Sequence, residues 1–485
     1  MADLTRSRSR PASLLVRLLM MLALSFAAML QPAAAQSVLR DAETEDLFRD
    51  MVRPLVEAAG MRPENVNVVL LNSSEINAFV AGGQTIYFFS GTITSADNAN
   101  EIQGIMAHEL GHITGGHVLS TGEGAKAATG IMILSLLLGA AAMAAGGGEA
   151  GAGIMAAGQQ AALGKFLAFN RVQESAADQA GAAYLNKAGI TGKGSLSFFR
   201  KLQNQEFRYA IPQTDDYPRT HPLSGDRIQA LEEVYRSVPS WEAKPDPLLE
   251  ERFQRVKAKL AGFVDDPKRT LVRYPETDKT IPARYARAYA WHKSAYPDRA
   301  SAEVDALLAA RPRDPYFLEL KGQILLESGK PREALESLRE AMQLAPDQPL
   351  ISALFGHALI STEDDKNFDE AKRVLRAAIG RDNSNPFAWY QLGIIFDREG
   401  DTAGAALATA ERHSLEGNVM GAMTSAHLAM KGTRPGTREC LRAQDIAMAS
   451  RALIEQNRDK SAAKRLAEAE KRRPAPVECG GGRTG

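Results

Sequence analysis

The stretch "IMAHELGHITGGH", Ile105 to His117, holds three histidines and one glutamate within ten residues. His108 and His112 are four residues apart, so on an α-helix of about 3.6 residues per turn both side chains project from one face. Two imidazoles at this spacing can share a tetrahedral Zn²⁺, and Glu109 beside them is the expected base. The stretch therefore predicts a metal-binding helix.

The third histidine, His117, lies nine residues after His108. At about 100° per residue it falls on the opposite face if the helix continues. A helix break at Gly115 and Gly116 would bring it back, as in the pattern H-E-x-x-H-x-x-G-x-x-H, but here the histidine arrives one residue too early. We therefore expect His117 at the helix end or behind a ligand, and not among the ligands.

A third ligand must come from elsewhere, and "FNRVQESAADQAGAAYL" is the best candidate. Its period is helical, so Glu174 and Asp178, four residues apart, share one face. Glu174 can complete a His, His, Glu site, while Asp178 buttresses a ligand histidine or handles protons. A solvated acidic face is the alternative, and the upstream "HELGH" favours the metal site.

Two β-rich runs, "NVNVVLLN" and "QTIYFFSG", surround the loop-like "AGG" at Ala81 to Gly83. They predict a small sheet packed before the "HELGH" helix. An extended substrate strand could pair with the edge formed by "QTIYFFSG". Residues 36–260 are thus expected to form one domain of α+β, mainly helical, class.

From Ile281 onward the sequence repeats itself. Gly322 and Gly356 are 34 residues apart, and Gly356 and Gly393 are 37 apart, which is one 34-residue period with a three-residue insertion near "EDDKN". The period resembles tetratricopeptide repeats, which stack helix pairs into a curved solenoid with a concave binding face. An ordinary α-bundle is the alternative. The predicted boundaries are a polar linker at 261–280, an all-α repeat solenoid at 281–470 and a flexible tail at 471–485.

The first 35 residues resemble an export signal, with arginines first, then an apolar run and a small-residue site suited to cleavage after Ala35. An uncleaved anchor is the alternative. Without the four arginines and one aspartate of this segment, 54 basic and 57 acidic residues remain. The remaining chain therefore has no excess of positive charge that would favour binding to nucleic acid. Export permits disulfides, and Cys440 and Cys479 either pair or remain two thiols.

An uncharged run of 22 residues, Ala127 to Gly148, reaches the length of a membrane span. However, His112 precedes this run and Glu174 follows it, so a single crossing would leave two ligands on opposite sides of the bilayer. Residues 127–163 are therefore interpreted as an apolar hairpin that covers the cleft or makes peripheral contact with a membrane.

Three motifs in order, "INAFVAGGQTIYFFSG", "EIQGIMAHELGHITGGH" and "RVQESAADQAG", resemble the metallopeptidase family that includes the CAAX prenyl protease and HtpX. The resemblance implies a gluzincin-like fold and a zinc metalloendopeptidase activity. It also implies one Zn²⁺ per chain, which polarises the substrate carbonyl and activates water. The implied roles are zinc ligand for His108, His112 and Glu174, catalytic base for Glu109, and proton donor for Asp178.

A further histidine, His221, lies in "YPRTHPLSGDRI", and a similar "THP" followed by an arginine occurs in these peptidases. His221 either steadies the oxyanion of the transition state or occupies the open zinc position in a resting enzyme, with Arg227 as its supporting partner. A loop histidine fixed by Pro222 is the structural alternative.

The combination of leader, peptidase and repeats resembles periplasmic members of this family that act on outer-membrane proteins. It implies a periplasmic endopeptidase, with or without chaperone activity, whose repeats bind misfolded or stalled outer-membrane proteins and their assembly machinery. The alternative is a repeat-based periplasmic chaperone or scaffold with a latent peptidase. The intact "HELGH" motif and Glu174 count against a vestigial site, although they are compatible with latency.

Overall fold

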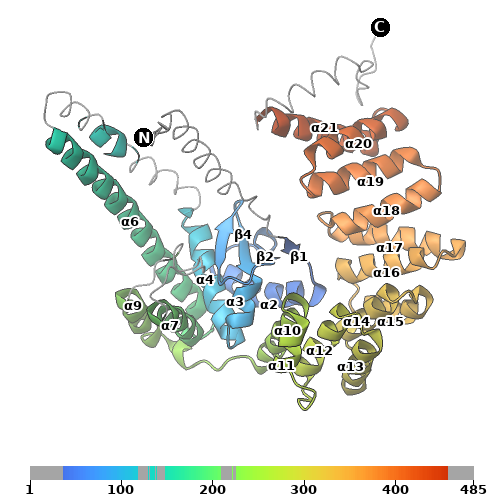
Figure 1. Cartoon of the computed structure of the whole chain (residues 1–485), viewed down its shortest axis with the longest axis horizontal. Coiled ribbons are helices and arrows are strands. Elements are labelled where there is room, and N and C mark those ends of the chain that lie inside the picture. The colour runs from blue at the N-terminus through green and yellow to red at the C-terminus, as the bar shows by residue number, and fades with distance from the viewer. Residues whose placement is uncertain are drawn as a thin grey trace, which may run out of the picture. The chain divides into compact units, whose positions relative to one another are not determined.

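The computed structural model describes residues 37–117, 129, 131–136, 138, 148–208, 221 and 225–456 (Figure 1). The predicted leader at 1–35 and the predicted tail at 471–485 lie outside these residues. Within the described part of the chain, no helix is both long enough and apolar enough to cross a membrane.

A four-stranded sheet lies in the N-terminal half, with the order β1-β2-β4-β3. β2 runs parallel to β4, and β3 runs antiparallel to it. Gly82 and Gly83 adopt φ values of +61° and +97°, so they can form the tight turn between β3 and β4. The prediction that "QTIYFFSG" offers a free edge is wrong, because β4 is paired on both sides, and β3 and β1 are the two edge strands. The strands are β1 (Val38–Leu39), β2 (Asn67–Leu71), β3 (Ala78–Ala81) and β4 (Thr85–Phe89).

Helices pack around this sheet and share one hydrophobic core with it, to which Phe48, Phe88, Leu110 and Phe253 contribute. The helix of the "HELGH" motif, α4, is buried from its first residue to His112. This half confirms the predicted α+β, mainly helical, class. Its helices are α2 (Ala42–Ala58), α3 (Ser90–Ser95), α4 (Ala99–Thr114), α6 (Gly148–Lys187), α7 (Lys193–Arg208), α9 (Gly225–Arg236) and α10 (Pro247–Val264), with the short turns η1 (Pro63–Asn65) and η2 (Pro239–Glu242).

The C-terminal half is a stack of antiparallel helix pairs, as Figure 1 shows. The pairs follow the predicted 34-residue period, and the inserted turn η3 (Asp365–Asn367) accounts for the longer third step. The glycine at the position of Gly322 is explained by close packing, because a Cβ there would lie 2.3 Å from Leu338 of the next helix. The helices are α12 (Ile281–Lys293), α13 (Pro297–Ala310), α14 (Pro315–Glu327), α15 (Pro331–Leu344), α16 (Pro349–Ser361), α17 (Phe368–Arg381), α18 (Pro386–Arg398), α19 (Thr402–Leu415), α20 (Val419–Gly432) and α21 (Arg438–Gln456).

The two halves meet without an extended spacer. Residues 261–280, predicted as a linker, hold the end of α10 and all of α11 (Pro267–Arg273). Gly262 of α10 lies so close to α12 that a Cβ would come within 2.5 Å of the carbonyl oxygen of Ala286. About half of the predicted linker is therefore helical, and at Gly262 it packs against α12.

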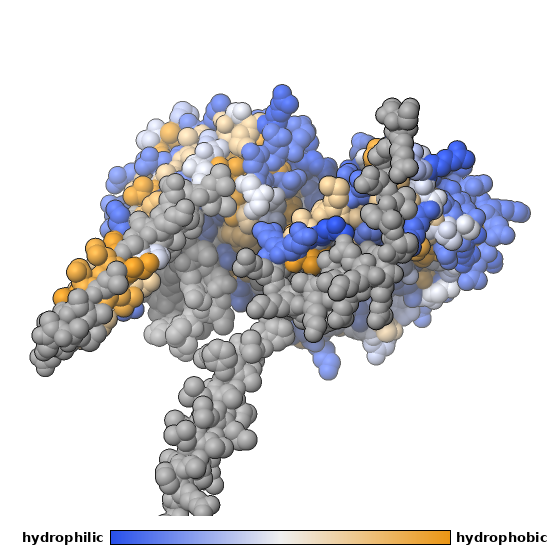
Figure 2. Space-filling view, turned by 90° about the horizontal axis from the view of Figure 1, so that it is seen from above, coloured by the Kyte–Doolittle hydropathy of each residue, from blue (hydrophilic) through white to orange (hydrophobic). Residues whose placement is uncertain are grey.

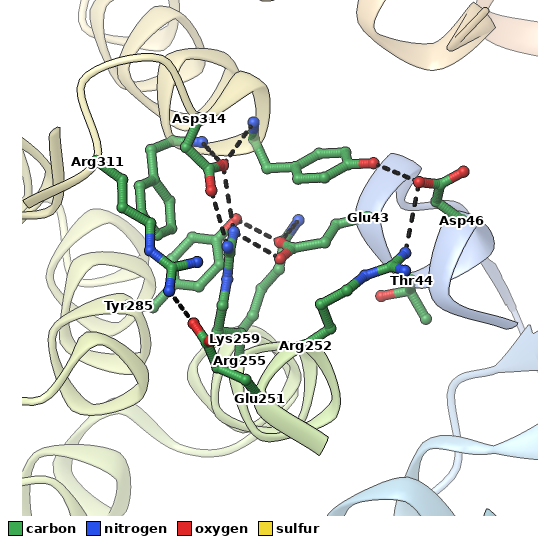
Figure 3. Close-up of polar contacts among 12 residues, drawn as sticks. Glu43, Thr44, Asp46, Glu251, Arg252, Arg255, Lys259, Tyr285, Arg311 and Asp314 are labelled. Carbon is green, nitrogen blue, oxygen red and sulfur yellow. Dashed lines mark hydrogen bonds and ion pairs between the residues drawn. The ribbon is translucent and has the colours of Figure 1, made fainter. Parts of the chain in front are cut away.

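A buried charge cluster holds this junction together (Figure 3). Arg255 of α10 donates to Asp314 at 2.7 Å and pairs with Glu43 of α2 at 2.8 Å. Tyr285 of α12 donates to Glu43 at 2.8 Å, and Lys259 of α10 lies 3.5 Å from the same carboxylate. Helices from both halves thus converge on one carboxylate, which fixes the first repeat against the peptidase half.

Of the two cysteines in the sequence, Cys440 lies in the described part, at the start of α21. It is disulfide-bonded. The other cysteine, Cys479, lies outside the described residues.

Candidate metal centre

The site forms where α4 crosses α6 at close range. Gly111 of α4 faces Ala177 of α6, and a Cβ on Gly111 would lie 2.5 Å from the Ala177 carbonyl oxygen. Gly181 of α6 faces Ala107 in the same way, at 2.9 Å. With no Cβ on either glycine, the two backbones approach closely enough for Glu174 to reach the histidines of α4.

Four side chains converge there: His108, His112, Glu174 and His221, with potential ligand atoms within 4.8 Å of one another. The Nε2 atoms of His108 and His112 are 3.1 Å apart. The Glu174 carboxylate lies 3.4 Å from Nε2 of His108 and 3.3 Å from Nε2 of His112. All four residues are less than a tenth exposed.

These separations fit a metal ion. Four ligand atoms about 2.0 to 2.2 Å from a tetrahedral zinc ion would be roughly 3.3 to 3.6 Å apart, close to the separations seen here. Asp178 lies 2.9 Å from Nδ1 of His108 and accepts its proton, so Nε2 is the atom through which the neutral ring would bind a metal. Lone pairs and a carboxylate that face one another are stabilised by a cation between them.

The electrostatic surroundings favour a cation as well. Burial opposes protonation of His108, yet its hydrogen bonds with Asp178 and Glu174 raise its pKa to about 10. Burial dominates at His112 and lowers its pKa to about 3, which keeps that ring neutral, as a metal ligand must be. The same negative surroundings that hold a proton on His108 would also hold a metal ion.

Glu109 lies beside this cluster with a fully buried carboxylate, and neither oxygen has a hydrogen-bond partner among the described residues. Burial raises the pKa of this carboxyl above its ordinary value, although His221 and His108 oppose the shift. Nε2 of His221 lies 3.6 Å from the Glu109 carboxylate. A buried carboxylate without a partner, facing a candidate metal site, is suited to accept a proton from a bound reactant.

Asp178 is placed to hold the ligand histidine His108 in its orientation. Besides His108, it accepts from Nη2 of Arg227 at 2.9 Å, and the same guanidinium pairs with Glu174 at 2.9 Å. Although burial opposes it, the hydrogen bonds from Arg227 and His108 hold the pKa of Asp178 below its usual range. An ionised carboxylate held this way orients a ligand imidazole, and it is a poor proton donor.

His221 reaches the cluster from outside α4 and α6. Its Nδ1 lies 3.0 Å from Glu174 and 3.2 Å from Nε2 of His108. This is where a fourth ligand would be, which is one of the two roles considered for His221 from the sequence.

His117 lies closer to the site than helical periodicity suggests. α4 ends at Thr114, and Gly116 has a left-handed φ of +64°, so the helix does not carry His117 to its far face. Instead, Nδ1 of His117 lies 2.9 Å from Nδ1 of His112. The Gly-Gly pair was the signal in the sequence that this could happen.

Comparisons with known proteins agree with this architecture. Residues 40–235 match the model of peptidase family M48, and residues 316–348 match a tetratricopeptide repeat. The chain is 25% identical to the beta-barrel assembly-enhancing protease of Yersinia pestis over 304 residues, which is 60% of each chain. It is also 25% identical to the putative beta-barrel assembly-enhancing protease of Vibrio cholerae over 390 residues, or 79% of each.

A shorter relative, Metalloprotease LoiP of Escherichia coli, is 29% identical over 169 residues, or 34% of this chain and 61% of the relative. The Yersinia match likewise spans less than two thirds of the relative's length. The resemblance predicted from the sequence motifs is confirmed. The chain therefore contains a domain of peptidase family M48 followed by tetratricopeptide repeats, and it is similar to the beta-barrel assembly-enhancing proteases.

Proposed function

We propose that this chain is an exported zinc-dependent endopeptidase that acts in the periplasm in the quality control and assembly of outer-membrane proteins. The observation that carries the proposal is the convergence of His108, His112 and Glu174 on one point, with the buried carboxylate of Glu109 beside it. The names of the relatives support the assembly role, and the leader-like first 35 residues support export.

In this proposal His108, His112 and Glu174 hold one zinc ion, which when bound polarises the scissile carbonyl. Glu109 accepts a proton from the attacking water and returns it to the leaving amine, a role suited to a carboxylate whose pKa is raised by burial. Asp178 and Arg227 orient His108 and Glu174. The role of proton donor does not suit Asp178, because Arg227 and His108 hold its pKa below the usual range and keep it ionised.

The substrate chain would bind along β3. This strand lies at one edge of the sheet, and extended peptides commonly add to an exposed edge through main-chain hydrogen bonds. β3 takes the place that the sequence had suggested for β4.

Glu109→Gln tests the proposed chemistry. The variant keeps the shape of the side chain but cannot accept a proton, so cleavage of an unfolded substrate such as casein should fall by about 10²- to 10⁴-fold while zinc content is unchanged. Glu57→Gln, on the exposed face of α2, is the matched control and should leave cleavage unchanged. Full activity of Glu109→Gln, with zinc bound, would refute the proposed mechanism.

The second candidate function is a periplasmic chaperone or scaffold with a latent peptidase, and His221 is the observation that favours it. Its ring occupies the fourth position of the cluster, where it would block substrate. If His221 caps the site, His221→Ala should raise basal proteolysis. If His221 steadies the oxyanion, the same change should lower kcat with zinc content unchanged, and unchanged activity would exclude both roles.

The repeat half is the proposed site for misfolded or stalled outer-membrane proteins and their assembly machinery. α17 to α21 border a groove of about 1090 Å³, lined by apolar residues such as Trp389, Phe396 and Leu407 together with charged residues such as Arg442. Aromatic and arginine side chains are the groups that most often anchor protein partners.

Residues 127–163 are the proposed site of peripheral membrane contact. Ile133, Leu134, Leu136 and Leu138 are each about half exposed. Figure 2 shows apolar residues gathered on one projecting part of the surface. Apolar side chains exposed together in this way often mark a surface that contacts a membrane or another protein. Co-sedimentation with lipid vesicles, compared between the parent and Leu134→Asp, would test this contact.

A further inference from the structure

We infer that His117 is a positioning residue that sets the orientation of His112 by accepting a hydrogen bond from its Nδ1. The inference rests on the proposed metal site. Its first basis is the 2.9 Å contact between the two Nδ1 atoms, with the rings 5.0 Å apart and nearly perpendicular.

The protons of this contact follow from the metal site. His112 faces the other candidate ligands with Nε2, so that atom must carry the lone pair and Nδ1 must carry the proton. Nδ1 of His112 therefore donates, and Nδ1 of His117 must accept. Among the described residues, no other group bonds Nδ1 of His112.

The local backbone is shaped to allow this contact. A Cβ on Gly115 would lie 2.4 Å from Nε2 of His117, so the ring occupies space that only glycine leaves open. Gly116, with its left-handed φ of +64°, turns the chain back toward α4. Two consecutive glycines thus place an imidazole behind the second ligand.

His117 thereby matches the role that Asp178 has for the first ligand. Each ligand imidazole is held through Nδ1, His108 by a carboxylate and His112 by an imidazole. An outer partner of this kind fixes the tautomer and the ring direction of a ligand, and its loss typically weakens metal binding by about 10- to 100-fold. A neutral imidazole does so without adding negative charge beside Glu174 and Glu109.

An isosteric pair of variants of the full-length chain separates the hydrogen bond from the packing. Asn places its Oδ1 close to the position of the His Nδ1 and can accept, whereas Leu has nearly the same shape and cannot. We expect His117→Leu to raise the zinc dissociation constant by about 10- to 100-fold, and His117→Asn to remain within about threefold of the parent. The measurement is competition with a chromogenic chelator, and the visible absorption of bound Co²⁺ should change in His117→Leu only.

Gly115→Ala tests the same contact without touching the histidine. Its backbone φ of −74° suits alanine, so the added methyl should displace the His117 ring while α4 stays intact. Gly115→Ala should weaken zinc binding as His117→Leu does, and the double variant should be no weaker than either single variant. Circular dichroism of the metal-free proteins should be the same for all variants.

The outcomes separate this inference from the proposed metal site. If the parent binds zinc no better than His112→Ala, the metal site itself is wrong. If the parent binds zinc, His112→Ala does not, and His117→Leu binds as tightly as the parent, the metal site stands and the role of His117 is refuted. Equal weakening in His117→Leu and His117→Asn would also refute it, because the acceptor would then not matter.

Discussion

Replacing Arg255 by alanine should uncouple the repeats from the peptidase half. The Arg255 side chain is only 5% exposed, and its guanidinium contacts Asp314, Glu43 and the face of the Phe317 ring. Alanine would leave both carboxylates buried without this partner. Removing one member of a buried ion pair costs about 3 to 5 kcal/mol, and solvent screening reduces this value little at such low exposure.

Urea unfolding followed by tryptophan fluorescence can detect the loss. Trp241 lies in the peptidase half, Trp291 in the first repeat helix and Trp389 in α18, so variants that keep one tryptophan report on each part separately. In the parent, Trp241 and Trp291 should report one shared transition, because the junction couples them. In Arg255→Ala the two transitions should separate, with a loss of about 3 to 5 kcal/mol.

The control is Arg200→Ala, which removes an ion pair with Glu232 from a side chain that is 50% exposed. Pairs of this kind contribute about 0 to 1 kcal/mol. If Arg255→Ala costs no more than Arg200→Ala and the transitions still coincide, the buried charges do not hold the junction, and apolar packing between α10 and α12 must hold it instead.

Two further predictions concern packing and pH. Gly111→Ala should push α4 away from Ala177 of α6, which should lower the free energy of unfolding by about 1 to 3 kcal/mol and weaken zinc binding. Gly153 has open space around it, so Gly153→Ala should change neither quantity. Equal zinc affinity in both variants would contradict the close-approach explanation. Burial opposes ionisation of Asp41, but the Lys259 ammonium 2.5 Å away holds its pKa below the ordinary value. Its stabilising contribution should therefore be complete above about pH 4 and be lost as pH falls through the lowered pKa, so the urea midpoint of Asp41→Asn should depend less on pH between 3 and 5 than that of the parent.

Much of this architecture follows from local periodicity. A helix places residues four apart on one face whatever surrounds it, so the sequence alone predicted that His108 and His112 act together. The 34-residue spacing likewise predicted the helix pairs, and it located a three-residue insertion near "EDDKN", where the structure has the turn η3. In each case the determining interactions lie within one helix or between neighbouring helices.

Tertiary packing decided what local periodicity could not. Glu174 reaches the histidines of α4 because glycines on both helices let the backbones approach, a contact between segments about 65 residues apart in the sequence. β3, and not β4, is an edge strand because of how β2 and β3 pair with β4, and His117 returns to His112 because Gly115 leaves room for its ring. Burial of Glu43 between α2, α10 and α12 is a fourth case. Contacts of this kind depend on which surfaces meet, and residue spacing along the chain does not contain that information.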